Sequence, residues 1–300
     1  MQAKKMPRDG TIGIFSPSHV AETERYAPII DAIERRGFTV KLGENFTKNT
    51  YGYAASAEER AADLNALVAD TGVQMILFSG GDSAVEILPL IDYDNIRRNP
   101  KLFSSYSDAT SILTSVYAKT GLITYYGFGA GQFLDLRYYD YMQFCSNFVE
   151  GYCKPDEFVS DSVWKTLRGG SCEGTLIGGY NSLFALMLSG PYFTYDTDKK
   201  YLLFLEDHEK FNDVGAVSTC LAFIGQSAFM RNVTGLIFGH YAVIVPDDLL
   251  RCLERFGTAH NIPVVYTDDF GHGTKHAILP IGINAKLDAD NQSMTFCDNQ

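Results

Sequence analysis

The stretch Lys101-Leu-Phe-Ser-Ser-Tyr-Ser-Asp-Ala-Thr-Ser-Ile-Leu113 predicts a short strand that turns sharply into a helix. Residues 102–106 include the bulky and aromatic side chains that strands prefer. Asp108 and the hydroxyl residues after it suit the first turn of a helix, where side-chain oxygens and negative charge meet unpaired N–H groups. From Ile112 onward, apolar residues recur at helical spacing. Repetition of such a unit along the chain would indicate an α/β fold.

The alternation of strand and helix does repeat through the N-terminal half. Strands are predicted over residues 11–16, 38–42, 73–78, 102–106 and 121–126. Helices are predicted between them, over residues 22–36, 57–69 and 84–91 and after the turn at residue 107. Residues 73–78 are apolar nearly throughout, as expected of a buried parallel strand. The pattern therefore predicts a parallel sheet with helices on both faces.

Residues 127–172 interrupt this pattern, because they are rich in aromatic and charged residues and contain Gly and Pro. They are interpreted as a helix that covers the sheet, followed by a linker. A second unit then continues with predicted strands at 201–205, 233–238 and 262–266, predicted helices at 182–188, 214–230 and 247–255, and two short closing strands near 281–284 and 293–296. The predicted organisation is an N-terminal domain over 1–150, a linker over 151–172 and a smaller C-terminal domain over 173–300.

Composition limits the classes of function. Basic residues number 25 and acidic residues 36, for a net charge of −11, which disfavours a nucleic-acid partner because phosphate binding needs a basic face. No run of 18 uncharged apolar residues is present, so no membrane span is expected. The basic N-terminus leads directly into a predicted strand, without the apolar region of a signal peptide. We therefore expect a cytoplasmic protein with no membrane partner.

The cysteines point to free thiols. None of the six forms a C-x-x-C pair, and in a cytosolic chain they are expected to be buried or half-buried thiols, with neither disulfides nor a zinc site. No cysteine lies in a strand-to-helix turn, so a nucleophilic cysteine is disfavoured.

Ser107 lies between the predicted strand and the predicted helix. A serine at this position projects its hydroxyl above the sheet, and the N–H groups that follow point at whatever the hydroxyl attacks; this arrangement is a nucleophile elbow. The usual signature has Gly two positions before and after the Ser, where this chain has Ser105 and Ala109, both small. The alternative is that Ser107 merely caps the helix.

A second strand-to-helix turn, Ser79-Gly-Gly-Asp82, follows the apolar strand 73–78. Its glycines let the backbone come close to a ligand, although neither a P-loop nor a dinucleotide motif is present. We expect the N–H of Gly81 or Asp82 to form half of an oxyanion hole, with the N–H of Asp108 as the other half. Both loops would lie at the carboxyl edge of one parallel sheet. The alternative is a tight turn without a ligand.

Two positions in the second half suit a catalytic carboxylate and a base. Glu206 ends an apolar strand, where it either orients an imidazole or marks the exit to solvent. His272 lies between two glycines in a loop and is hard to explain as core packing, while His208 is an alternative base. His276 follows His272 at a spacing of four, but the glycines argue against the helix that a metal-binding pair would need, and no metal is predicted. The order Ser107, Glu206, His272 is that of α/β-hydrolases.

Several segments, taken together, resemble the LD-carboxypeptidase family of serine peptidases, which also contains the microcin C self-immunity hydrolases. The resemblance runs along the whole chain in family order. The matching stretches are Thr11-Ile-Gly-Ile-Phe-Ser-Pro-Ser18, Phe78-Ser-Gly-Gly81, Leu88-Pro-Leu-Ile-Asp-Tyr-Asp94, Ile96-Arg-Arg-Asn-Pro-Lys101, Tyr106-Ser-Asp-Ala-Thr110, Tyr117-Ala-Lys-Thr-Gly-Leu122, Leu176-Ile-Gly-Gly179, Leu203-Phe-Leu-Glu-Asp207, Phe270-Gly-His-Gly273 and Leu279-Pro-Ile-Gly282.

The resemblance implies a mechanism and an architecture. Ser107 would be the nucleophile, Glu206 the acidic member of a triad and His272 its base, with no metal and no organic cofactor. The N-terminal domain would be Rossmann-like, the C-terminal domain would be a smaller α/β domain of different topology, and the site would lie in the cleft between them. A homodimer is also implied.

The chain departs from the family pattern at three places. It has Ser105 where the family has Gly, Gly127-Phe-Gly129 where the family has His-Gly-Pro, and Tyr180 where the family has Asn. No triad member is affected, so the departures bear on substrate identity more than on chemistry.

The resemblance leaves the substrate open. The main expectation is a murein tetrapeptide, cut between an L-diamino acid and D-Ala; the alternative is a peptidyl or aminoacyl nucleotide of the microcin C type. Trp164 could stack on a base, and could equally be a packed aromatic. A different class also stays open, since two α/β domains around a cleft describe binding proteins that close on a small molecule without reacting.

Overall fold

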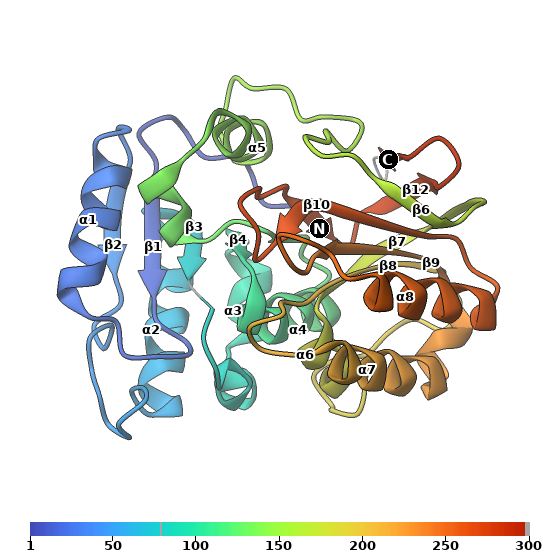
Figure 1. Cartoon of the computed structure of the whole chain (residues 1–300). Helices are drawn as coiled ribbons and strands as arrows, with labels where there is room; N and C mark the ends of the chain where they lie inside the picture. Colours follow the sequence, from blue (N-terminus) through green and yellow to red (C-terminus); the bar gives the residue numbers. More distant parts are fainter. Residues whose placement is uncertain (79, 298–300) are drawn as a thin grey trace. The chain divides into compact units, whose positions relative to one another are not determined.

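The computed structural model describes residues 1–78 and 80–297, which form two compact units (Figure 1). The first unit is Met1–Lys154 and the second begins at Pro155. Part of the range predicted as a linker belongs to the second unit, because the strand β6 (Lys165–Arg168) pairs antiparallel with β10 (Val264–Gly271). The backbone of Phe158 also donates to the carbonyl of Met294, at 2.8 Å.

The first unit is built on a parallel sheet. Its strands are β1 (Thr11–Phe15), β2 (Thr39–Leu42), β3 (Val73–Phe78), β4 (Leu102–Ser105) and β5 (Thr124–Tyr126). They lie in the order β5-β4-β3-β1-β2, and each adjacent pair is parallel. This is a doubly wound order that reverses between β1 and β3, where such sheets bind ligands at the carboxyl edge. The predicted Rossmann-like architecture is confirmed.

Helices cover both faces of this sheet. The helices α2 (Ala57–Ala69), α3 (Tyr93–Arg98) and α4 (Thr110–Thr120) pack against one another and against the strands, with the 3-10 helix η1 (Ala84–Leu90). On the other side lie α1 (Thr23–Glu34), the 3-10 helix η3 (Ala130–Asp135) and α5 (Tyr138–Phe148). The α5 rings of Phe144 and Phe148 pack edge-on against Phe38 and Tyr125, with ring centroids 5.7 and 4.9 Å apart. Aromatic packing therefore holds α5 on the unit, as predicted for the helix after residue 127.

Two local differences from the prediction have simple causes. The segment predicted as a helix at 84–91 is the 3-10 helix η1, which contains Pro89 and so lacks one backbone donor. The helix α3 was not predicted, because six residues are too few to show a period; Asp92 caps it by accepting the N–H of Asn95 at 2.8 Å.

The second unit contains a mixed sheet. Besides β6 and β10, the strands of this sheet are β7 (Ser171–Tyr180), β8 (Tyr201–Glu206), β9 (Val233–His240), β12 (Asn284–Asp288) and β13 (Ser293–Cys297). The short strand β11 (Leu279–Ile281) is not part of this sheet. The sheet order is β13-β12-β7-β8-β9-β10-β6. The four strands β7 to β10 are parallel, and the strands at the edges are antiparallel. This confirms an α/β domain whose topology differs from that of the first unit.

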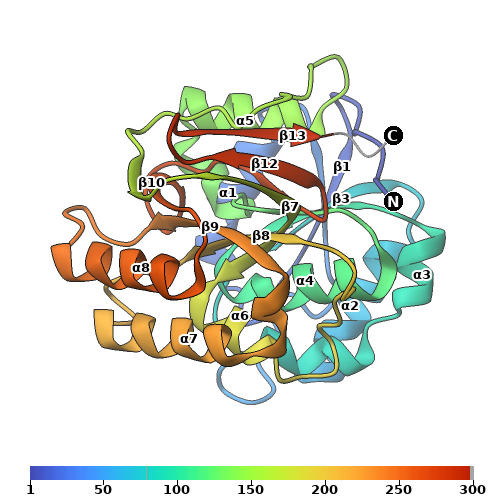
Figure 2. The same ribbon diagram turned by 90° about the vertical axis from the view of Figure 1, so that its right-hand side faces the viewer.

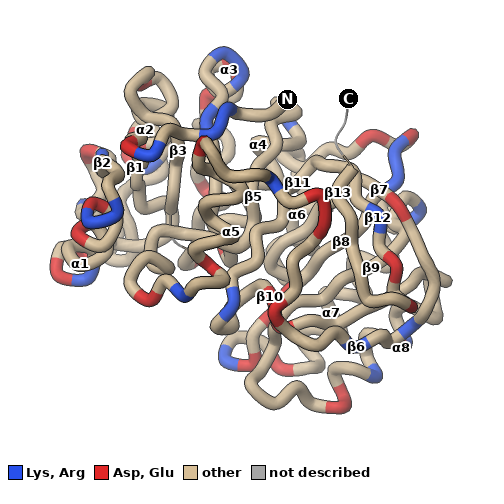
Figure 3. The backbone as a smooth tube through the Cα atoms, turned by 90° about the horizontal axis from the view of Figure 1, so that it is seen from above, with Lys and Arg blue, Asp and Glu red and all other residues tan. Residues whose placement is uncertain are grey.

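Three helices lie together in the second unit. They are α6 (Asn181–Met187), α7 (Val214–Gln226) and α8 (Asp247–His260), and α7 lies beside both of the others (Figure 2). The 3-10 helix η4 (Ala228–Asn232) follows α7, since Ser227 has an extended backbone that ends the predicted helix early. No Lys, Arg, Asp or Glu lies within α7 (Figure 3). Even so, among the described residues no helix combines the length and apolarity needed to cross a membrane.

The six cysteines are free thiols. Cys145 and Cys252 are buried and three others are half-buried, whereas Cys153 is exposed, contrary to the expectation for all six. Burial raises the pKa of the Cys172 thiol to about 11 and also raises the pKa of Cys145. These thiols are therefore protonated at neutral pH and are poor nucleophiles.

Candidate active site

Ser107 occupies a strained turn between β4 and α4. Its backbone φ is +63°, a left-handed conformation that costs a residue with a side chain about 1–3 kcal/mol. Tyr106 before it is extended, and residues 107–109 form a 3-10 turn that leads into α4. Ser107 is therefore the first residue of the turn and does not occupy a capping position. A serine in a strained turn between a parallel strand and a helix has the geometry of a nucleophile elbow.

Hydrogen bonds from neighbouring strands hold the elbow. The N–H of Ser107 donates to the hydroxyl of Tyr126 at 2.9 Å. Ser105 donates its hydroxyl to the carbonyl of Phe78 at 2.6 Å, and Ser104 does the same to the carbonyl of Phe128, also at 2.6 Å. Ser105 and Phe128, which belong to two of the departures from the family pattern, thus both form hydrogen bonds next to the elbow.

The loop after β3 lies directly against the elbow. A Cβ atom built on Gly80 would be 2.7 Å from the Cβ of Ser107, and one built on Gly81 would be 2.7 Å from the Cβ of Ser18. Only glycine allows such approaches, so the Gly-Gly pair is explained by backbone packing next to the nucleophile. The two glycines were predicted to let the backbone approach a ligand, but the contact of Gly80 with Ser107 itself was not predicted. The oxyanion roles of Gly81 and Asp82 stay predictions.

Asp108 connects the elbow to the start of η1. Its carboxylate is buried, and Oδ2 accepts the backbone N–H of Ala84 at 2.8 Å. Burial raises the pKa of this carboxyl. The N–H of Asp108 belongs to the first turn after the strand, where backbone donors have no intrahelical acceptor.

In the second unit, the parallel strands end at a common edge that carries polar side chains. Tyr180 at the end of β7 is in register with Glu206 at the end of β8, and Gly271 at the end of β10 is in register with His240 at the end of β9. His272 follows immediately. The strand β10 is longer than predicted and extends to Gly271, so the strand itself positions the histidine.

His272 and Glu206 form a hydrogen-bonded pair. The distance from His272 Nδ1 to Glu206 Oε2 is 2.8 Å, and the Glu206 side chain is fully buried. An ionised carboxylate only accepts, so Nδ1 carries the proton and Nε2 is the basic nitrogen of the neutral ring. Glu206 therefore fixes the tautomer that a general base requires, and the interpretation of Glu206 as an exit to solvent is wrong.

Opposing effects set the pKa of His272. Burial on its own lowers the pKa, but the negative charge of Glu206, its hydrogen bond and the charge of Asp207 outweigh burial, so the pKa is raised above its ordinary value of 6.5. The protonated ring is thus stabilised by adjacent carboxylates, as expected of an imidazole that receives a proton during a reaction.

The glycines on both sides of His272 are required by close packing. Gly271 has a φ of +103°, and a Cβ atom there would be 2.9 Å from Glu206 Oε2. A Cβ atom on Gly273 would be 2.7 Å from Cγ of His240. The Gly-His-Gly sequence therefore lets the chain pass close to one carboxylate and one imidazole.

Aromatic rings surround His272. The ring centroids of Tyr180, Phe211 and His208 lie 5.3, 5.6 and 5.8 Å from its own. Asn212 donates a hydrogen bond to the Tyr180 hydroxyl at 3.1 Å, which holds the ring of Tyr180, the residue that stands where the family has Asn. Among the residues that the structure describes, no three His, Cys, Asp or Glu side chains are arranged to hold a metal ion.

His208, the alternative base, has different partners. Its Nδ1 accepts the backbone N–H of Lys210 at 3.0 Å, whereas the carboxylate of Glu206 lies against His272. Burial, followed by the nearby His272 and His240, lowers the pKa of His208. The carboxylate–imidazole pairing favours His272 as the base.

Trp164 is packed within the second unit. Only 4% of it is exposed, its Nε1 donates to Asp269 Oδ2 at 3.0 Å, and its ring meets that of Phe158 edge-on at 5.4 Å. These contacts favour a packed aromatic over a ring that stacks on a ligand.

Comparison with known families identifies the class of protein. Residues 12–127 match the model described as the LD-carboxypeptidase N-terminal domain, and residues 173–287 match that of the LD-carboxypeptidase C-terminal domain. These ranges cover well over half of the chain and include Ser107, Glu206 and His272. The chain belongs to the LD-carboxypeptidase family of serine-type peptidases.

Individual relatives include both branches of this family. The chain is 28% identical to the microcin C7 self-immunity protein MccF of Escherichia coli, over 96% of this chain and 93% of that one. It is 28% identical to the "probable murein peptide carboxypeptidase" of Bacillus subtilis, over 95% and 90% of the two chains. A solved structure of MccF in complex with aspartyl sulfamoyl adenosine has the same fold, with a TM-score of 0.84, 24% identity and coverage of 100% and 99%.

Proposed function

We propose that the protein is a serine carboxypeptidase with the triad Ser107, Glu206 and His272. The observation that carries the proposal is the 2.8 Å contact between His272 Nδ1 and the buried carboxylate of Glu206, in a chain whose Ser107 occupies a left-handed elbow. A buried carboxylate–imidazole pair has little value for packing, since burying the charge is costly. It has a clear use as the base of a serine nucleophile.

The proposed reaction begins with proton transfer. Nε2 of His272 accepts the hydroxyl proton of Ser107 while Oγ attacks the carbonyl of an amide near the C-terminus of the substrate. This step requires the two groups to come within about 2.6–3.2 Å of each other. Glu206 stabilises the imidazolium that forms. His272 then protonates the leaving amine, and a water molecule, deprotonated by the same ring, releases the acyl group from Ser107.

The negative charge on the carbonyl oxygen needs backbone donors. We assign this role to the N–H of Asp108 and to the N–H of Gly81 or Asp82. The packing of Gly80 against Ser107 supports this assignment, because it brings the loop after β3 to the nucleophile. Donors of this kind act mainly in the transition state and typically contribute about 10²–10³ in rate each.

The substrate that we favour is a murein tetrapeptide, hydrolysed between an L-diamino acid and D-Ala. Both halves of the chain match LD-carboxypeptidase models, and a relative named for a murein peptide carboxypeptidase covers 95% of the chain. A cytoplasmic location and a homodimer fit this role and stay predictions.

A second substrate class is favoured by a specific finding. The relative named for microcin C7 self-immunity covers 96% of the chain, and MccF has been solved with an aminoacyl sulfamoyl nucleoside. An aminoacyl or peptidyl nucleotide is therefore the alternative substrate. The same triad would serve, since the bond broken is again the one between an acyl carbonyl carbon and a nitrogen atom, with the nitrogen leaving as part of the nucleotide.

The function is tested with the Ser107→Ala variant and mass spectrometry of products. The wild-type protein should release D-Ala from a murein tetrapeptide, or amino acid from an aminoacyl sulfamoyl nucleoside, and the variant should lose about 10⁴–10⁶ in kcat. Ser115→Ala is the matched control, because Ser115 lies in α4 and its hydroxyl has no hydrogen-bond partner among the described residues. Wild-type hydrolysis by the Ser107→Ala variant would rule the triad out.

A further inference from the structure

Arg60 is a buried cation outside the proposed triad. Its side chain is 1% exposed, and it belongs to the helix α2 of the first unit. A buried guanidinium is costly unless all its donors are used. Its partners therefore indicate what the residue does.

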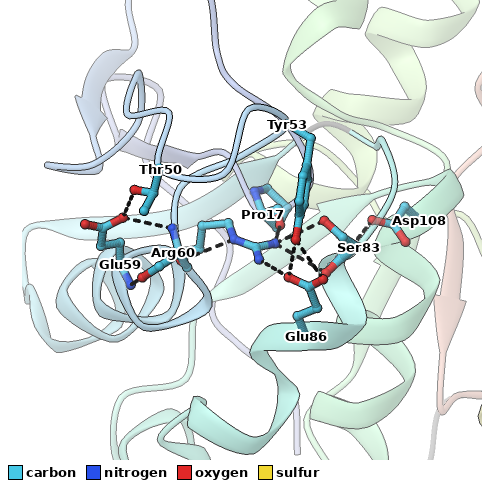
Figure 4. Close-up of polar contacts among 10 residues, drawn as sticks. Pro17, Thr50, Tyr53, Glu59, Arg60, Ser83, Glu86 and Asp108 are labelled. Atoms are coloured by element: carbon cyan, nitrogen blue, oxygen red, sulfur yellow. Dashed lines mark hydrogen bonds and ion pairs between the residues drawn. The ribbon is translucent and has the colours of Figure 1, made fainter.

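The start of α2 fixes the position of Arg60. Ser56 and Glu59 form a reciprocal capping box: Ser56 Oγ accepts the N–H of Glu59 at 3.2 Å, and Glu59 Oε2 accepts the N–H of Ser56 at 2.8 Å. Thr50 also donates its hydroxyl to Glu59, at 2.6 Å (Figure 4). Arg60 follows in the first turn of a well-capped helix, so its backbone is held in place.

The guanidinium of Arg60 joins the loops that follow β1 and β3. Nη1 donates to the carbonyl of Pro17 after β1, and to the carbonyl and hydroxyl of Ser83 after β3, both at 3.3 Å. Nη2 forms an ion pair with Glu86 in η1, and Tyr53 donates to the same carboxylate at 2.9 Å (Figure 4). One planar group thus fixes two loops at the point where the sheet order reverses.

Asp108 holds the residue next to Ser83. Ser83 has a φ of +91°, so its peptide is turned into a conformation that a residue with a side chain rarely adopts. The next N–H, that of Ala84, donates to Asp108 Oδ2 at 2.8 Å. Asp108 follows Ser107 directly. The C-terminal end of the loop is consequently tied both to Arg60, through Ser83, and to the residue after the nucleophile, through Ala84.

We propose that Arg60 is a positioning residue which, together with the Asp108 carboxylate, holds the loop at residues 80–83 in the conformation that binds the oxyanion. The inference rests on the proposed function, because it assigns a role in the same reaction. The hydrogen bonds of Arg60 reach Pro17, Ser83 and Glu86, and none of them involves Ser107. Arg60 acts by fixing the Ser83 carbonyl and by setting the distance between the loop donors and the N–H of Asp108.

This role predicts a particular kinetic signature. Oxyanion donors are used in the transition state, so a displaced loop should lower the maximal rate and leave ground-state binding nearly unchanged. A misplacement of about 1 Å can cost about 10²-fold in rate. Lysine keeps the charge but lacks the planar fork that reaches Pro17, Ser83 and Glu86 together, so Arg60→Lys should restore only part of the rate.

The test measures phosphonylation of Ser107 by a fluorophosphonate probe in the full-length protein. The maximal rate and the half-saturating probe concentration are compared for the wild type, Arg60→Gln, Arg60→Lys and Leu64→Ala. Leu64 is a fully buried residue of the same helix, so Leu64→Ala is a control that destabilises the unit without touching the loop. We expect Arg60→Gln to lower the maximal rate about 10–100-fold and to change half-saturation by less than about 3-fold. At a similar loss of melting temperature, Leu64→Ala should keep its rate.

The labelling rates of the variants show whether Arg60 positions the loop. A rate for Arg60→Gln no lower than that of Leu64→Ala would overturn it and leave the proposed function standing. Absence of Ser107 labelling in the wild type would overturn both. Should Arg60→Gln fail to fold, Glu86→Gln becomes decisive, since the Glu86 side chain is 41% exposed and its replacement is tolerable. A lowered maximal rate with unchanged half-saturation in Glu86→Gln supports the inference, and a wild-type rate overturns it.

Discussion

Replacement of Gly271 by Ala tests the close approach between the end of β10 and the carboxylate of Glu206. The new Cβ would lie 2.9 Å from Oε2, 3.0 Å from Cβ and 3.1 Å from Cδ of Glu206. These separations are well below ordinary contact distances between carbon atoms, which begin near about 3.5 Å. Because Glu206 is fully buried, it cannot turn away into solvent, and its contact with His272 has to change.

The magnitude follows from two costs. The φ of +103° imposes a backbone penalty of about 1–3 kcal/mol on alanine. Overpacking against Glu206 adds about 1–3 kcal/mol. The variant should therefore lose about 2–6 kcal/mol of the free energy of unfolding. A shift of about 1 Å between His272 and its carboxylate should lower kcat about 10²-fold.

The assay compares Gly271→Ala with Gly170→Ala. Gly170 has a similar φ of +115°, but a Cβ atom added there would be 3.9 Å from its nearest neighbour, the Cβ of Pro263. Gly170→Ala should therefore show only the backbone penalty in chemical denaturation and should keep its peptidase activity.

A folded Gly271→Ala variant whose kcat stays within about 3-fold of the wild type would show that an added Cβ at this position does not disturb the contact between His272 and Glu206. An equal loss of activity in Gly170→Ala would also contradict the prediction, since the loss would then come from general destabilisation.

Two further predictions concern the second unit. Glu206→Gln removes the main cause that raises the pKa of His272 and leaves burial, which lowers it, and Asp207, which raises it. The base acts in its neutral form, so kcat/KM should fall on the acidic side of a midpoint that lies above pH 6.5 in the wild type. In Glu206→Gln this midpoint should move to lower pH, and the plateau of kcat/KM should fall about 10²–10⁴-fold. An unchanged midpoint in the pH–rate profile would show that another group titrates. Trp164→Phe removes the hydrogen bond from Nε1 to Asp269, so thermal or chemical unfolding should show a loss of about 1–3 kcal/mol with an unchanged KM, and a KM raised more than about 5-fold would instead indicate a ligand contact.

Where capping residues and the apolar pattern indicated the same boundary, the sequence alone was sufficient to predict the ends of an element. The bounds of α2 and β3 were predicted to the residue, because a capping serine starts the helix and a nearly continuous apolar run that follows Gly72 defines the strand. The position of Ser107 between a strand and a helix was predicted in the same way, since the change from strand pattern to helix pattern falls within a few residues.

The length of β10 could not be predicted. Thr267 and Asp269 are polar, and a strand was expected to end before them, yet both are fully buried in β10. Asp269 accepts from Ser160, from the N–H of Asp161 and from Trp164, all more than 100 residues earlier. Buried polar groups need partners, and here the partners come from a distant segment.

The sequence by itself determined the α/β class, most of the elements and the residue types of the site, because these depend on patterns a few residues long. The tertiary structure decided which groups meet: His272 with Glu206, Gly80 with Ser107, and Arg60 with Pro17 and Ser83. Such contacts depend on strand order, register and the absence of a Cβ atom at a crowded position. Strand order and register cannot be read from the local sequence pattern, and a glycine shows that a position is crowded without showing which residue it contacts.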